Sequence, residues 1–110
     1  MNRTFIETPV FTHKWQKLGL TDEDLRNLQN TILEDPKSAG DVIPGTGGLR
    51  KIRMAAKGHG KRGGARVIYV DIEVKESIYL LNVYGKNEKK DLTPAEKNAL
   101  KAAVIVLQEE

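Results

Sequence analysis

Hydrophobic residues recur along the chain with two different periods. Between residues 9 and 34, and again between 94 and 107, they return every three or four positions, which is typical of amphipathic helices. In the segments 49–55, 65–73 and 77–84 they alternate or run continuously over short stretches rich in β-branched residues, which predicts strands. Residues 3–8 are expected to form one further short strand.

Capping residues mark where the predicted helices begin. Thr21 stands three positions before Asp24 and Thr93 stands three positions before Glu96, the spacing of a capping box. Thr8 precedes a proline, which is favoured at the first helical position because its missing N–H needs no partner there. The sequence therefore predicts helices that start after Thr8, Thr21 and Thr93.

The order of the predicted elements is β-α-α-β-β-β-α. The loops between the last three strands are short, so we expect antiparallel hairpins. Helices and strands in separate blocks are typical of an α+β fold. We therefore expect an antiparallel sheet with the helices packed on one face, in a single domain that spans residues 1–110, with Trp15 in the core.

Composition excludes several kinds of site. The 110 residues include no cysteine and only two histidines, so disulfides and thiolate metal sites are ruled out and a histidine zinc site is not expected. No apolar run is as long as the ~18 residues of a membrane span, and the first residues lack the apolar core of a signal peptide. We expect a cytoplasmic protein without a cofactor and without a membrane partner.

Charge is distributed unevenly. Residues 42–70 contain seven basic residues and no Asp or Glu, although the net charge of the whole chain is only +3. Basic charge concentrated in this way indicates a polyanionic partner such as nucleic acid, the alternative being an ordinary solvated loop.

A glycine-rich segment joins the first two of these three strands. Residues 58–63 match the pattern G-x-G-x-x-G, but a strand follows where a dinucleotide site requires a helix, so nucleotide binding is not expected. The segment is interpreted as a hairpin tip that brings basic side chains to a phosphate backbone or, alternatively, as a hairpin without that role. His59 in this tip is either a general base or simply exposed to solvent.

The strand before the tip separates apolar from basic side chains. Alternation places Ile52 on one face and Lys51 and Arg53 on the other. Arg66 lies just after the tip and would join them if a bulge turned it outward. Together these cations could hold a phosphate group, unless the strand face is merely solvated. Tyr84 and Lys86, at the end of the last strand, could meet this basic face.

Three strings of sequence resemble a known family. They are GTGGLRKIR at 45–53, GHGKRGGARVIY at 58–69 and YLLNVYGKNE at 79–88, and the resemblance extends over nearly the whole chain. The chain resembles the RelE/HigB superfamily of toxins from type II toxin–antitoxin modules, and within it the RelE-like HigB subgroup. The resemblance implies a ribosome-dependent endoribonuclease that needs no metal and cuts mRNA in the ribosomal A site.

The resemblance also implies roles for individual residues. The family's catalytic cations fall on Lys51, Arg53, Arg66 and Lys86, and Lys51 or Lys86 would take the proton from the attacking 2′-OH. A further family arginine is replaced by Asn87, and the family's catalytic tyrosine is missing from residues 91–93, where Tyr84 is the candidate substitute. RNA contacts are expected from Arg50, Lys57, His59, Lys61 and Arg62.

Partners follow from the same resemblance. They are the ribosome, its mRNA and a cognate antitoxin, expected to be HigA-like with a helix-turn-helix domain. Two other functions stay open on the residues alone. One is a ParE-like toxin that inhibits gyrase, and the other is a nucleic-acid-binding module without enzymatic activity.

Overall fold

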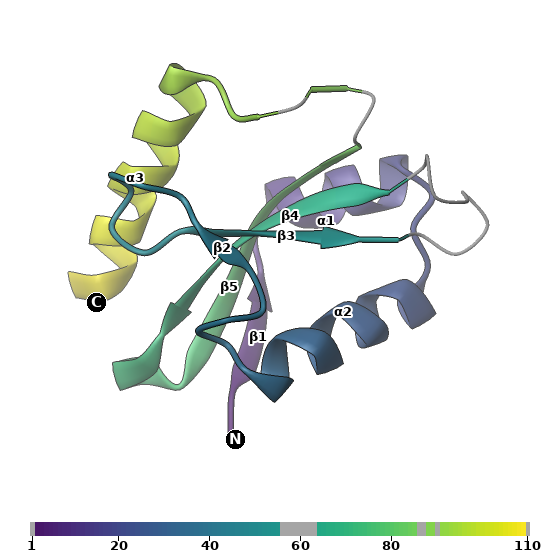
Figure 1. The fold of residues 1–110 in the computed structure, drawn as a ribbon, viewed down its shortest axis with the longest axis horizontal. Coiled ribbons are helices and arrows are strands. Elements are labelled where there is room, and N and C mark those ends of the chain that lie inside the picture. The colour runs from purple at the N-terminus through teal and green to yellow at the C-terminus, as the bar shows by residue number, and fades with distance from the viewer. Residues whose placement is uncertain (1, 56–63, 86–87, 90, 110) are drawn as a thin grey trace.

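The computed structural model describes residues 2–55, 64–85, 88–89 and 91–109 of the chain. The predicted order of helices and strands is confirmed, with one additional two-residue strand in the expected loop before residue 49. In chain order the elements are β1 (Thr4–Glu7), α1 (Pro9–Lys17), α2 (Asp22–Glu34), β2 (Asp41–Val42), β3 (Arg50–Met54), β4 (Ala65–Ile72), a 3₁₀ turn (Glu73–Lys75), β5 (Ser77–Gly85) and α3 (Pro94–Glu109) (Figure 1).

The described strands form one sheet in the order β1-β5-β4-β3-β2. The neighbours β2–β3, β3–β4 and β4–β5 are antiparallel, as predicted, but β1 lies parallel to β5. The expectation of a fully antiparallel sheet is therefore wrong at this edge. Everything from α1 to β4 separates β1 from β5, and a connection of that length lets two neighbouring strands run in the same direction.

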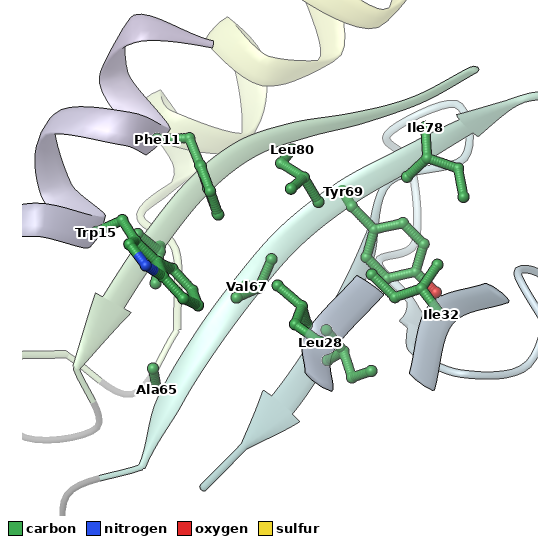
Figure 2. Close-up of a cluster of buried hydrophobic side chains, with 11 residues drawn as sticks. Phe11, Trp15, Leu28, Ile32, Ala65, Val67, Tyr69, Ile78 and Leu80 are labelled. Atoms are coloured by element: carbon green, nitrogen blue, oxygen red, sulfur yellow. The ribbon is translucent and has the colours of Figure 1, made fainter. Parts of the chain in front are cut away.

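One face of the sheet is covered by α1 and α2. Figure 2 shows Phe11 and Trp15 of α1 and Leu28 and Ile32 of α2 packed against the strands. The strand side chains in this cluster are Ile52, Ala65, Val67, Tyr69, Ile78, Leu80 and Val83. Trp15 is 5% exposed, which confirms its predicted place in the core.

The opposite face carries a second apolar cluster, and α3 covers it (Figure 1). Val104 of α3 is buried there against the sheet, with Leu100 and Leu107 beside it. The prediction that all helices pack on one face is wrong for α3. The physical reason lies in β4, where apolar side chains point to both faces and each apolar face needs a cover.

The predicted caps are present at all three helix starts. Thr8 Oγ1 accepts a hydrogen bond of 3.2 Å from Phe11 N. The capping boxes at Thr21 and Asp24 and at Thr93 and Glu96 are both closed, with four bonds between 2.9 and 3.1 Å. These local signals fix where each helix begins.

A glycine turn returns β2 to the edge of β3. Gly47 and Gly48 have φ angles of +78° and +116°, a backbone region that side chains with a Cβ rarely adopt. The turn is closed by a hydrogen bond of 2.8 Å from Ile43 N to Leu49 O. As a result, β2 and the residues just after it lie beside Lys51, on the basic strand.

Candidate functional site

Two arginines and a tyrosine form a row across three neighbouring strands. Arg53 of β3 pairs in register with Arg66 of β4, which pairs with Tyr84 of β5. Residues directly opposite each other on an antiparallel ladder share one face and have Cβ atoms about 5 Å apart. We call these three residues the cation row. It lies on the face that also carries the α3 cluster.

Arg66 reaches this face without the bulge that the sequence analysis required. The register does shift between Ile68 and Tyr69, but the extra residue is Leu81 on β5, and Arg66 stays in the regular ladder. Arg66 and Ile68 point the same way because the face is half basic surface and half apolar core. The expectation of a bulge at the hairpin is wrong for this reason.

The two arginines are not neutralised by the part of the chain that the structure describes. Arg53 is exposed and Arg66 is half-buried, and neither forms an ion pair with a described carboxylate. Like charges directly opposite each other on a sheet repel. Such a pair can bind an anion such as a phosphate group with charge-assisted hydrogen bonds.

Lys51 stands two positions before Arg53 and faces the same side. It pairs in register with Ile68, and its Nζ lies 2.8 Å from Asp91 Oδ1. The Lys51 side chain is 25% exposed and that of Asp91 is 64% exposed. Asp91 thus holds the amine of Lys51 at the margin of the cation row.

Tyr84 is the buried end of the row. Its side chain is 0% exposed, and its hydroxyl forms no hydrogen bond with a described residue. Burial raises the pKa of this hydroxyl, and the positive charge of Lys51 opposes the shift. The Nζ atom of Lys89 lies 5.3 Å from the centroid of the Tyr84 ring, within the range of a cation–π contact. Tyr84 therefore supports the site from below instead of standing on its surface.

Arg50 does not join this group. It pairs in register with Tyr69, on the face covered by α1 and α2, and its Nη1 donates a hydrogen bond of 2.8 Å to Gly40 O. The remaining predicted site residues, Lys57, His59, Lys61, Arg62 and Lys86, lie outside the described residues.

Two site residues were not found from the sequence. Asp91 binds Lys51, and Lys89 covers Tyr84 while it forms an ion pair with Glu96 at the start of α3. The signal that could have pointed to them is their position directly after the last strand, where the chain turns back toward the sheet.

The part of the chain that the structure describes has neither a cluster of metal ligands nor a helix that could span a membrane. Its residues contain no group of three or more His, Asp or Glu side chains that could hold a metal ion. Within the same residues, no helix is long and apolar enough to cross a membrane.

Comparison with known proteins gives consistent matches. The family model described as the RelE toxin of the RelE/RelB toxin–antitoxin system matches residues 3–109. The free form of a double mutant of the E. coli toxin RelE is 18% identical, with 96% of this chain and 99% of that chain covered and a TM-score of 0.62.

Two antitoxin complexes are also similar in structure. The same mutant toxin bound to a peptide of the antitoxin RelB is 20% identical, with 90% of this chain and 95% of that chain covered and a TM-score of 0.59. The intact E. coli RelBE toxin–antitoxin complex is 20% identical, with 76% and 94% covered and a TM-score of 0.56.

Proposed function

Because this chain belongs to the RelE toxin family, and is thus the toxin of a toxin–antitoxin module, we propose that it is a ribosome-dependent endoribonuclease. It acts as a single RelE-like domain in the cytoplasm, enters the ribosomal A site and cuts the mRNA there. The observation that carries the proposal is the pair of arginines, Arg53 and Arg66, that face each other without a described carboxylate between them.

The proposed reaction needs only the RNA, the side chains of the site and water. The ribose 2′-OH attacks the adjacent phosphorus, the P–O5′ bond breaks, and the products are a 2′,3′-cyclic phosphate and a 5′-OH. Arg53 and Arg66 bind the phosphate oxygens and stabilise the added charge of the phosphorane. The neutral amine of Lys51 or Lys86 accepts the proton of the 2′-OH, and O5′ takes a proton from water as it leaves. No step uses a metal ion.

Tyr84 has a different role in this proposal from the one the resemblance suggested. A hydroxyl that is 0% exposed does not contact the RNA, so Tyr84 acts as a positioning residue beneath Arg66 and Lys89. Arg50 is left out of the RNA-binding set because its guanidinium is held by Gly40 on the other face. Lys57, His59, Lys61 and Arg62 remain proposed RNA contacts.

In this proposal the ribosome positions the mRNA, which so small a site could not do alone. Holding the mRNA in a geometry ready for attack can lower a barrier by about 7–11 kcal/mol. A cluster of cations with little catalytic machinery of its own is therefore sufficient once the substrate has been positioned.

A cognate antitoxin is the partner of a toxin of this family, and the E. coli relative has been solved with RelB. We propose that the antitoxin of this chain is HigA-like, with a helix-turn-helix domain, and that it covers the cation row or blocks entry into the A site. Co-purification with the product of an adjacent gene tests this pairing, and toxicity unaffected by every adjacent gene would contradict it.

The decisive experiment for the activity is to induce the chain in cells and map the 5′ ends of mRNA with and without a drug that blocks translation. We expect cuts in register with codons that disappear when translation stops. Cuts that persist without translation would make the chain a free ribonuclease. DNA breaks at gyrase sites without mRNA cuts would make it a ParE-like toxin, and binding without either would make it a non-enzymatic module.

A further inference from the structure

A cavity of about 220 Å³ opens beside Lys51, on the face of the cation row. It lies between the β2 edge of the sheet and the segment that leads into α3. The residues that line it are Asp41, Val42, Ile43, Pro44, Lys51, Asp91, Leu92 and Lys97. Because Lys51 borders both the cavity and the cation row, a group in this cavity would be close to a phosphate held by Arg53 and Arg66.

The size of the cavity limits what it can hold. Sites for drug-sized ligands usually have volumes of about 300–1,000 Å³. This cavity is smaller and therefore suits one flat ring system, such as a single nucleobase, better than a whole nucleotide with its phosphate.

The walls provide an apolar surface for such a ring. Ile43 and Leu92, which are 8% and 6% exposed, line the cavity and belong to the apolar cluster that α3 covers. Bases that leave a stack are commonly held between aromatic or apolar side chains.

The charges at the cavity favour a neutral ligand. Two carboxylates, Asp41 and Asp91, are balanced by the two amines of Lys51 and Lys97. A phosphate group would be repelled by the carboxylates here but not at the cation row. Asp41 is exposed, and its side chain makes no hydrogen bond or ion pair with the described residues. It can accept a hydrogen bond from an incoming N–H group.

We propose that this cavity is a nucleobase subsite that reads one base of the mRNA next to the scissile phosphate. The proposal rests on the proposed function and adds a specificity to it. Asp41 accepts a hydrogen bond from the exocyclic amine of adenine, cytosine or guanine. Uracil has no exocyclic amine. Its single N–H donor, at N3, is flanked by two carbonyl oxygens that repel the carboxylate, so uracil is disfavoured at this position.

The test is the base composition at the cut sites of three proteins: the unchanged chain, Asp41→Asn and the control Glu34→Gln. The control removes an exposed carboxylate on α2, away from the cavity. The unchanged chain should cut sites with uracil at one fixed position roughly five- to tenfold less often than sites with an amine-bearing base, the lower part of the range for one good base contact. Asp41→Asn should remove this bias, because an amide can donate to uracil, and Glu34→Gln should keep it.

A second measurement does not depend on cleavage. Titration of the isolated chain with cytidine and with uridine, followed by NMR of the backbone amides, should shift Asp41–Ile43 and Leu92 with cytidine only. If the chain cuts no mRNA but these shifts occur, the proposed activity fails and the subsite stands. A bias unchanged by Asp41→Asn, an absence of bias in the unchanged chain, or equal shifts with both nucleosides would overturn the subsite.

Discussion

The two ends of β4 differ in how their charged side chains are paired. At the end near Ile72, Asp71 accepts hydrogen bonds of 2.8 and 3.2 Å from Arg3, and the two side chains are 7% and 11% exposed. At the end near Ala65, Arg66 faces Arg53, and no described carboxylate neutralises either residue. One strand therefore carries a matched ion pair at one end and two facing cations at the other.

This difference separates structural charge from functional charge. A largely buried carboxylate that binds an arginine fork just before β1 helps to hold this edge strand on the sheet. Two facing cations oppose folding, because bringing like charges together costs free energy. A pair that costs stability is best explained by an anion that it binds, and the predictions below test this contrast, beginning with the largest effect.

Removal of an arginine from the cation row should abolish most activity and leave the fold intact. For Arg66→Ala and for Arg53→Ala we expect cleavage on programmed ribosomes to fall about 10²–10³-fold, the usual loss when one stabilising donor is removed. Thermal unfolding should be unchanged or slightly shifted upward, because a repulsion is relieved. The control is Arg26→Ala, an exposed arginine on α2 that should cleave normally.

Removal of the charge of Asp71, near the other end of β4, should lower stability and leave cleavage unchanged. Asp71→Asn should lower the thermal midpoint of unfolding, because it leaves the largely buried guanidinium of Arg3 without its charged partner. Cleavage by the folded variant should stay normal. Lys37→Met is the matched comparison. Its pair with Glu73 is 69% and 51% exposed, and exposed pairs contribute little, so its midpoint should move less. A loss of cleavage in folded Asp71→Asn would contradict the assignment of Asp71 to a purely structural ion pair.

The ion pair of Glu96 should make the free energy of unfolding fall at low pH. Lys89 and the cap at Thr93 hold the pKa of Glu96 at about 2, below its ordinary value of 4.5. Because the folded state lowers this pKa, its stabilisation is complete above about pH 4.5 and is lost as the pH falls toward 2. We expect Glu96→Gln to lower the free energy of unfolding by about 1 kcal/mol at neutral pH. In urea unfolding, the stability of this variant should also depend less on pH between about 2 and 4.5.

The smallest effect concerns salt. Each phosphate contact should add about −0.7 to −0.9 to the log–log slope of ribosome binding against salt concentration. Arg53→Ala should therefore make the slope shallower by about one unit, and Asp71→Asn should leave it unchanged. Equal slopes for Arg53→Ala and the unchanged chain would show that Arg53 does not contact a phosphate.

Local signals in the sequence were sufficient for the helices and the three long strands, because caps and periodicity act within a few residues. Alternation also placed Lys51 and Arg53 correctly on the face opposite Ile52. What failed depends on distant partners. Neither the direction of β1 nor the side taken by α3 is encoded near those elements, and the pair between Lys51 and Asp91 joins residues that are 40 positions apart.

The second face could have been predicted from β4 itself. Its residues 67–70 are apolar without interruption, and a strand with one solvated face would alternate. Arg66 was difficult for the same reason, since it shares its side with Ile68, Val70 and Ile72. β2 has only two residues, too few for any period to be visible.

The parallel pairing of β1 with β5 has a consequence for how the chain folds while it is being made. Thr4 pairs with Ser77, so the chain must be synthesised beyond residue 77 before β1 can join the sheet. Contacts so distant in sequence slow folding, because a long loop must be ordered before it gains any stabilisation. β5 is also the strand that carries Tyr84 under the arginines. A nascent chain therefore cannot complete the cation row until β5 has left the ribosomal exit tunnel.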